Sequence, residues 1–414
     1  MRQEISKSQT KIDIPWGTLT GIRPAKVAEK LFISGAAKQS VVKTLIESYH
    51  VSADRAALCA ETALTALALK NTLVSKDIAL YIGIPFCTTR CAYCSFVSNS
   101  VERSFDLIDP FTDTLLKEIK TTAELADELG LRIIAVYIGG GTPTSLPEAA
   151  LEAILSALER FFEFKYLREY TVEAGRPDTI TEAKLKILTR TGAKRICINP
   201  QSMSEEVLAA IGRKHNPDDI YNAVNLVQLT GAVLNMDVIA GLPKDTLDGF
   251  RKTLDTVIGF APENITVHTL SLKKGSRLML ENTTSTATGK SHAVTPEAPL
   301  AALCENVGEM LDYASQRLRE NGYAPYYVYR QKYISGGFEN TGWSKPGYEG
   351  IYNICMMEEL CTVLALGGGG VTKIVTNDGR IERIFNAKYP REYIMMTEKI
   401  KDKVGRIREN AVSI

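Results

Sequence analysis

The sequence has no long hydrophobic run and no excess of charge of either sign. No stretch approaches the roughly 18 consecutive apolar residues of a membrane-spanning helix, and residues 1–7 contain no apolar signal core. Lys and Arg total 49 against 48 Asp and Glu among 414 residues, so the net charge of +1 gives no long-range attraction for nucleic acid or an anionic membrane. We therefore expect a cytoplasmic protein with no membrane span and no nucleic-acid partner.

Cysteine and histidine are also scarce. Eight cysteines in so long a chain do not make a disulfide scaffold, and the four histidines include no His-x3-His pair typical of a metal site. No Gly-x-Ser-x-Gly elbow supports a serine hydrolase. Five cysteines stand alone in apolar surroundings, where a thiol packs as a small hydrophobe, so we predict that they are buried in the core. They are Cys59, Cys197, Cys304, Cys355 and Cys361.

Between residues 78 and 275 the sequence alternates β-rich runs with amphipathic stretches, which is typical of parallel strands joined by crossover helices. The predicted strands are 78–85, 133–139, 169–174, 195–199, 233–239 and 265–270. The predicted helices between them are 111–129, 148–161, 183–191 and 250–260. Six such units make an incomplete (β/α)6 barrel.

The regions on either side of this series differ from it. Residues 1–76 contain two helix-forming segments, 24–32 and 53–73, and residues 281–296 almost lack large apolar side chains. Beyond them we predict helices at 299–321 and 356–366, with Gly367 to Gly370 ending the second, and strands at 370–375 and 380–385. The predicted fold class is therefore α/β. The division is a helical N-terminal appendage (1–76), a partial barrel (77–280), a linker (281–296) and a smaller C-terminal α/β domain (297–414).

Three cysteines share one loop after the first predicted strand. Cys87, Cys91 and Cys94 have Cys-x3-Cys-x2-Cys spacing, so their thiolates can face one point. A [4Fe-4S] cluster takes one ligand per iron, and three cysteines leave one iron open for a small molecule. A structural zinc site normally has four protein ligands at paired Cys-x2-Cys spacing, and no second pair follows. The spacing therefore favours an iron–sulfur cluster over zinc.

Glycines and polar residues stand at the ends of the other predicted strands. The second strand ends in Gly139-Gly140-Gly141-Thr142-Pro143, where missing side chains let backbone amides approach a ligand. Glu173, Gln201 and Asp237 end the next three strands, and acidic groups suit ribose hydroxyls. Arg213 offers a planar cation for a carboxylate. Because the carboxyl ends of parallel barrel strands meet at one face, we expect these groups to line one site.

This cysteine loop, on the first strand of a six-unit α/β series, resembles that of the radical S-adenosylmethionine (radical SAM) superfamily. Longer strings resemble its oxygen-independent coproporphyrinogen III oxidase group, in the coproporphyrinogen dehydrogenase-like bacterial branch. They include PWGTLTGIRP at 15–24, YIGIPFC at 81–87, VEAGRPD at 172–178 and GRKH at 212–215. The resemblance implies a partial (β/α)6 TIM-like barrel with its active site at the carboxyl ends of the strands.

The resemblance also implies cofactors. Cys87, Cys91 and Cys94 would bind a [4Fe-4S] cluster, whereas no catalytic side chain is implied. The contacts to S-adenosylmethionine (SAM) would come from Tyr81, Tyr93, Gly140, Gly141, Thr142, Glu173, Gln201, Arg213 and Asp237.

The implied activity is anaerobic oxidative decarboxylation of two coproporphyrinogen III propionates to vinyl groups in haem biosynthesis, giving protoporphyrinogen IX, with a low-potential electron donor such as flavodoxin or ferredoxin. A haem-trafficking chaperone of the same fold, or a radical enzyme acting on another porphyrin substituent, remain alternatives. Candidate contacts to the tetrapyrrole are three cations for propionates and three aromatic rings for pyrroles. They are Arg176, Arg330, Lys332, Tyr326, Tyr327 and Tyr329.

Three positions depart from the relatives. The dehydrogenases have His where Gly83 stands and a further Cys where Phe96 stands. The chaperones carry a His-Asn string where this chain has Tyr352-Asn353.

Overall fold

The computed structural model describes residues 15–96, 98–271, 276–278, 306–330, 337–376 and 379–411. Its main sheet follows the order β13-β12-β11-β1-β4-β5-β6-β7-β8-β10-β9. A second, two-stranded sheet joins β2 (Phe86–Cys87) to β3 (Asn99–Ser100) beside the cysteine loop. The predicted linker, Cys304 and Lys332 lie outside the described residues.

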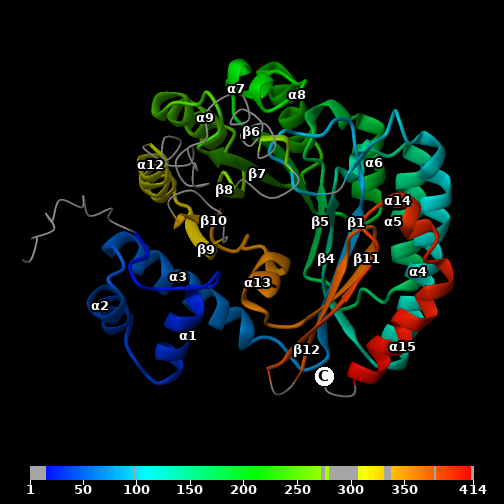
Figure 1. Cartoon of the computed structure of the whole chain (residues 1–414), viewed down its shortest axis with the longest axis horizontal. Coiled ribbons are helices and arrows are strands. Elements are labelled where there is room, and N and C mark those ends of the chain that lie inside the picture. The colour runs from blue at the N-terminus through cyan, green and yellow to red at the C-terminus, as the bar shows by residue number, and fades with distance from the viewer. Residues whose placement is uncertain are drawn as a thin grey trace, which may run out of the picture.

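Six parallel strands form the partial barrel and coincide with the six predicted strands. They are β1 (Asp77–Ile84), β4 (Arg132–Gly140), β5 (Glu169–Glu173), β6 (Arg195–Gln201), β7 (Val233–Ala240) and β8 (Asn264–Thr269). Neighbouring strands are joined by helices, and Figure 1 shows these helices along the outer face of the sheet. The predicted α/β partial barrel is therefore confirmed.

The crossover helices bury one apolar stripe each. In α4, for example, Phe111, Leu115 and Ile119 recur every four residues and are fully buried. The helices are α4 (Ile108–Glu128), α5 (Glu148–Phe161), α6 (Glu182–Arg190), α7 (Glu205–Ala210), α8 (Pro217–Gln228) and α9 (Leu247–Gly259). Short 3-10 helices are η1 (Phe105–Leu107), η2 (Pro143–Ser145), η3 (Pro177–Thr179) and η5 (Thr397–Lys399). The helix α8 was missed from the sequence, although its capping box of Asn216 and Asp219 is a helix-start signal.

The strands of the C-terminal part extend the barrel sheet at both ends. They are β9 (Ala324–Arg330), β10 (Glu339–Ser344), β11 (Thr362–Gly367), β12 (Val371–Val375) and β13 (Ile381–Phe385). β11 pairs in parallel with β1, whereas β10 pairs antiparallel with β8. The helices of this part are α12 (Val307–Glu320), α13 (Ile351–Glu358), α14 (Pro390–Ile394) and α15 (Ile400–Ala411).

The prediction of a helix at 356–366 is wrong. The helix α13 ends at Glu358, with Glu359 in the left-handed region as its cap, and residues 362–367 form the strand β11. All six residues of β11 are buried, so its sequence is apolar on both faces and gives no period that separates strand from helix. Gly367 accordingly ends a strand, and residues 368–370 turn the chain into β12.

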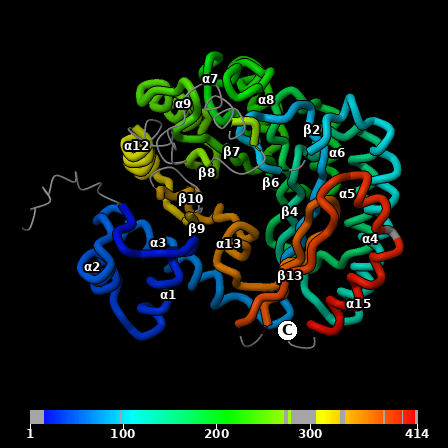
Figure 2. Tube along the Cα trace, viewed as in Figure 1, coloured from blue at the N-terminus to red at the C-terminus, as the bar shows by residue number. Residues whose placement is uncertain are grey.

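The helix α13 lies inside the curve of the sheet, as the tube in Figure 2 shows. Its N-terminus meets β5, because one carboxylate oxygen of Glu169 accepts hydrogen bonds from the backbone amides of Ile351 and Tyr352. A carboxylate suits this position because the first amides of a helix have no partner within the helix. This contact fixes the helix at the wall of the barrel interior.

Three helices form the N-terminal appendage, which lies to one side of the barrel (Figure 1). They are α1 (Ala25–Ile33), α2 (Lys38–Tyr49) and α3 (Ala53–Lys70). The fully buried Trp16 donates from Nε1 to Glu339 of β10 at 2.7 Å, and Arg55 of α3 contacts the same carboxylate at 2.9 Å. The Pro-Trp-Gly string thus attaches the appendage to the C-terminal strands. Within the described ranges, no helix combines the length and apolar content that crossing a membrane requires.

Candidate active site

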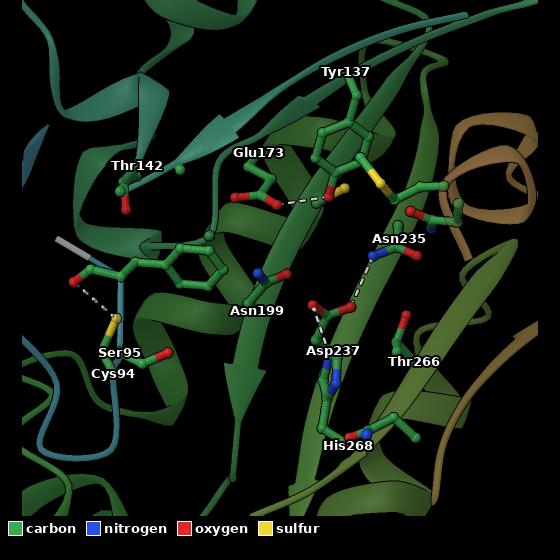
Figure 3. A pocket seen from close by; sticks show the side chains of 18 of the residues that line it. Cys94, Ser95, Tyr137, Thr142, Glu173, Asn199, Asn235, Asp237, Thr266 and His268 are labelled. Carbon is green, nitrogen blue, oxygen red and sulfur yellow. Dashed lines mark hydrogen bonds and ion pairs between the residues drawn. The ribbon is translucent and has the colours of Figure 1, made fainter. Parts of the chain in front are cut away.

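A cavity of about 740 Å³ opens into the barrel, and all twelve predicted site residues line it. They are Tyr81, Cys87, Cys91, Tyr93, Cys94, Gly140, Gly141, Thr142, Glu173, Gln201, Arg213 and Asp237. The volume falls within the roughly 300–1,000 Å³ of ligand sites in proteins. Figure 3 shows side chains from successive barrel strands pointing into this space.

The three cysteines of the loop surround one end of the cavity. The Cys87 thiol lies 3.3 Å from the Thr142 hydroxyl, and the Cys91 thiol accepts from Arg176 Nη1 at 3.6 Å. Within the described ranges, no three His, Cys, Asp or Glu side chains converge on the position of a single metal ion. In a [4Fe-4S] cluster each cysteine binds a different iron, so three thiols that line one cavity can each supply one ligand.

Two buried guanidinium groups favour the ionised form of the middle thiol. Burial acts to raise the pKa of Cys91, but the positive charges of Arg213 and Arg176 outweigh it, so this pKa lies below its ordinary value. Burial raises the pKa of Cys94 to about 11, with the nearby Cys91 adding to the effect. Because iron binds the thiolate, the arginines prepare Cys91 as a ligand.

Arg213 is held rigidly beside the cavity. Its Nη1 donates to the backbone carbonyls of Gly175, at 3.2 Å, and Asn199, and its Nη2 lies 3.4 Å from the Tyr93 hydroxyl. Its Nε is buried, and no hydrogen-bond partner for it occurs in the part of the chain that the structure describes. The same is true of Gln201 Oε1 and Asn199 Oδ1, which line the same cavity. Buried polar atoms are rarely left without a partner, so these three atoms indicate a polar ligand and fit the predicted SAM site.

The glycine turn after β4 also packs against the chain that leads to the cysteine loop. The Gly141 amide donates to Ile84 O and the Thr142 amide to Phe86 O, both at 2.7 Å. A Cβ atom on Gly141 would lie only 2.1 Å from Phe86 O. These amides are therefore engaged with the chain that leads to Cys87, and the missing side chains let this chain pack against the turn.

Glu173 lies at the centre of the site. Its Oε1 accepts a hydrogen bond from the Tyr137 hydroxyl at 2.6 Å (Figure 3). A Cβ atom on Gly139 would lie only 2.9 Å from the carboxyl carbon of Glu173. Burial raises the pKa of Glu173 to about 7, although the bonds from Tyr137 and the Gly140 amide act against this rise. The carboxyl group is therefore poised between its two protonation states near neutral pH.

Sequence reasoning missed several polar residues deeper in the barrel. Asp237 accepts from Asn235 Nδ2 at 3.0 Å, and its other oxygen lies 3.4 Å from His268 Nε2 (Figure 3). Tyr137 stacks on Tyr352 of α13 with ring centroids 4.5 Å apart. The signal was present in the sequence, because polar residues alternate along the strands. They occupy positions 169, 171 and 173, then 195 and 199, then 235 and 237, then 266 and 268.

Only some of the candidate substrate contacts line the cavity. Tyr327 and Tyr329 line the cavity, whereas Tyr326 is buried and accepts a hydrogen bond from Asn353. Arg176 lies beside Cys91 and pairs with Asp178 at 3.2 Å. Arg330 does not line the cavity, since it donates to the carbonyls of Leu19 and Gly337. The four described lone cysteines, Cys59, Cys197, Cys355 and Cys361, are buried as predicted.

Two departures from the relatives have a structural context. Gly83 pairs with Gly367 across the β1–β11 boundary, and a Cβ on Gly83 would lie 2.5 Å from Gly368 O. A histidine there would displace the turn between β11 and β12. Phe96 lines the cavity and is 60% exposed, so an aromatic ring stands at this position beside Cys94.

Comparison with known proteins agrees with this geometry. The model of the radical SAM superfamily matches residues 81–257. The chain is 38% identical over 392 residues to the oxygen-independent coproporphyrinogen-III oxidase-like protein HemZ of Bacillus subtilis, covering 94% of this chain and 75% of that protein. It is 26% identical over 318 residues to the heme chaperone HemW of Escherichia coli, covering 77% and 75% respectively.

A solved structure gives the same fold. Coproporphyrinogen III oxidase HemN from Escherichia coli, described as a radical SAM enzyme, superposes with a TM-score of 0.60 at 21% identity, over 82% of this chain and 73% of that chain. The chain belongs to the radical SAM superfamily, and within it to the oxygen-independent coproporphyrinogen III oxidase-like group.

Proposed function

We propose that the protein is a radical SAM enzyme of haem biosynthesis that oxidatively decarboxylates coproporphyrinogen III. Each of two propionates would lose a hydrogen atom, then CO2 and one electron, the electron passing to an external electron acceptor, and would become a vinyl group, giving protoporphyrinogen IX. The proposal rests on one observation. The three cysteines of the loop, buried polar atoms that lack a hydrogen-bond partner in the described residues, and several tyrosines all line one cavity. The reaction would take place in a reducing compartment such as the cytoplasm, where clustered thiols remain available for iron.

Each part of the cavity has a task in this proposal. Cys87, Cys91 and Cys94 would hold a [4Fe-4S] cluster, and the positive charge of Arg213, which lines the same cavity, would attract the methionine carboxylate of SAM. Reduced by a donor such as flavodoxin or ferredoxin, the bound cluster would supply the one-electron reduction of SAM that generates a radical for hydrogen abstraction from the substrate. Glu173 and Asp237 hold the amino acid and ribose parts of SAM, and the enclosed barrel excludes water from the radical.

The other residues of the predicted SAM set complete this pocket. Tyr81 and Tyr93 cover the cofactor with aromatic rings, and Gln201 supplies its partnerless Oε1. Gln201 has a positive φ of 66°, which a non-glycine residue adopts at a cost, so its side chain is held at the end of β6 against a local strain. Gly140, Gly141 and Thr142 pack against residues 84–86 and so position Cys87, which follows them.

The proposal is tested by anaerobic incubation of reconstituted protein with coproporphyrinogen III, SAM and a reductant, followed by mass analysis of the porphyrins. We expect loss of one or two carboxyl groups together with release of 5′-deoxyadenosine. A protein in which all three cluster cysteines are replaced by alanine is the control and should give neither. A gained methyl group would indicate a radical methyltransferase instead.

A haem chaperone is the second candidate, because Phe96 stands where the dehydrogenases carry a cysteine and because HemW is similar over most of its length. Such a protein would bind haem in a one-to-one complex without converting a porphyrin. Unchanged coproporphyrinogen III beside tightly bound haem would favour this function.

A further inference from the structure

The hairpin of β12 and β13 presents one face to the cavity. Val371 lies directly opposite Phe385, and Lys373 lies directly opposite Arg383. All four residues line the cavity, so the inner face of the hairpin carries one apolar pair and one pair of cations.

This pair of cations is poorly neutralised by the protein. Like charges directly opposite each other on a sheet destabilise it. Glu359 is 3.4 Å from Arg383, but it also pairs with Arg23 at 2.7 Å, so one carboxylate serves two guanidinium groups. Lys373 Nζ donates to the Met356 carbonyl at 3.3 Å, and no salt bridge joins it to a carboxylate within the described ranges. The inner face of the hairpin therefore carries more positive than negative charge, with Lys373 partly buried and Arg383 44% exposed to solvent.

The electrostatic surroundings of Lys373 agree with this reading. Burial lowers the pKa of Lys373 to about 8, and the neighbouring Arg23 and Arg383 contribute to the shift, while Glu359 opposes it. An anionic ligand would remove the repulsion and restore the charged form.

The cation pair lies at the far end of the cavity from the cysteine loop. Lys373 pairs with Val363, and Val363 pairs with Ala79 of β1. Gly83 lies four residues further along β1, or about 13 Å at a rise of about 3.3 Å per residue, and the cysteines follow it. Thioether and aromatic side chains line the same cavity near the hairpin. They are Met356, Met357 and Phe385.

We propose that Lys373 and Arg383 bind the carboxylates of the tetrapyrrole that do not react. This inference rests on the proposed function. Coproporphyrinogen III carries four propionates, of which the reaction converts two, and the other two are neighbours on the opposite rim of the macrocycle. Two neighbouring cations at the end of the cavity away from the cluster match this arrangement, and the adaptable methionines suit the apolar ring system. The hairpin thus orients the reacting propionates toward the cluster end.

The test is equilibrium binding of coproporphyrin III to the anaerobic, cluster-loaded and SAM-bound protein, followed by fluorescence quenching. Lys373→Met and Arg383→Met should each raise the Kd about tenfold or more, because each removes a charge-assisted hydrogen bond to a carboxylate. Lys373→Arg should restore most of the affinity. The matched control is Lys388→Met, an exposed lysine just after β13 that does not line the cavity, and it should bind as the wild type does.

A neutral analogue separates charge recognition from general damage to the site. The tetra-amide of coproporphyrin III has the same shape without charge, so its Kd should be equal for the wild type and both methionine variants. Variants that bind coproporphyrin III as tightly as the wild type, or that lose the tetra-amide equally, would overturn the inference and leave the proposed function standing. A wild-type protein that neither binds coproporphyrin III nor converts coproporphyrinogen III would overturn both.

Discussion

Gly141→Ala should release the cluster loop from the barrel. The added methyl carbon would lie 2.1 Å from Phe86 O, 2.7 Å from Phe86 C and 3.0 Å from Ile84 O, and all three are backbone atoms that cannot rotate away. The segment 84–86 must therefore move, which costs about 1–3 kcal/mol as overpacking. The hydrogen bonds from the Gly141 and Thr142 amides hold this same segment, and weakening them costs about 1 kcal/mol each. Cys87 follows Phe86 directly, so the first cluster ligand moves with it.

The assay is iron and sulfide content after anaerobic reconstitution, together with the melting temperature of the metal-free protein. We expect Gly141→Ala to lose most of its iron and to melt at a lower temperature. Gly259→Ala is the matched control, because no atom lies within 4 Å of the Cβ position at the end of α9 and its φ is not positive. A Gly141→Ala protein with the same iron content and the same melting temperature as the control would refute the claim that the turn positions the loop of Cys87, Cys91 and Cys94.

Three further changes test the site and its support. The folded-state pKa of Glu173 is about 7 against an ordinary 4.5, so its ionisation costs stability as the pH rises through this window. Glu173→Gln should therefore raise the melting temperature of the metal-free protein at pH 8 and much less at pH 5; equal shifts at both would contradict the assigned burial. Arg213→Lys should raise the Kd for SAM about tenfold or more, because a lysine has no fork of donors to replace the guanidinium. Unchanged SAM affinity in equilibrium dialysis would remove Arg213 from the site. Glu118→Ala should lower the free energy of unfolding by about 3–5 kcal/mol, because it leaves the buried Lys403 ammonium, now 2.8 Å away, without its carboxylate. Chemical denaturation measures this, and a loss below about 1 kcal/mol would show that water solvates the ammonium.

The barrel strands and the cluster site were predictable because their signals are local. Each strand is a short apolar run that ends at a glycine or a polar residue, and the three cysteines lie within one loop. The position of Glu173 on the cavity followed from the geometry of parallel strands. Arg213 instead follows α7 and is held beside the cavity by the carbonyls of Gly175 and Asn199.

The C-terminal strands were harder to predict because their partners are distant in sequence. The segment 362–367 is a strand because β1, nearly 300 residues earlier, offers it an edge with a matching Gly83. The acceptors of the Gly141 and Thr142 amides, Ile84 and Phe86, are likewise distant in sequence, so these hydrogen bonds could not be predicted. The role proposed for Lys373 depends on its pairing with Arg383 across β12 and β13. No periodicity in the sequence reveals which residues of the two strands face each other.

The most direct test of the account is the transfer of a labelled hydrogen atom. Coproporphyrinogen III deuterated on its propionate side chains is incubated anaerobically with the reconstituted protein, SAM and a reductant, and the 5′-deoxyadenosine is analysed by mass spectrometry. The account predicts deuterium in the 5′-deoxyadenosine and vinyl groups on the porphyrin. Deuterium-free 5′-deoxyadenosine with every propionate intact would contradict the claim that this cavity decarboxylates a tetrapyrrole.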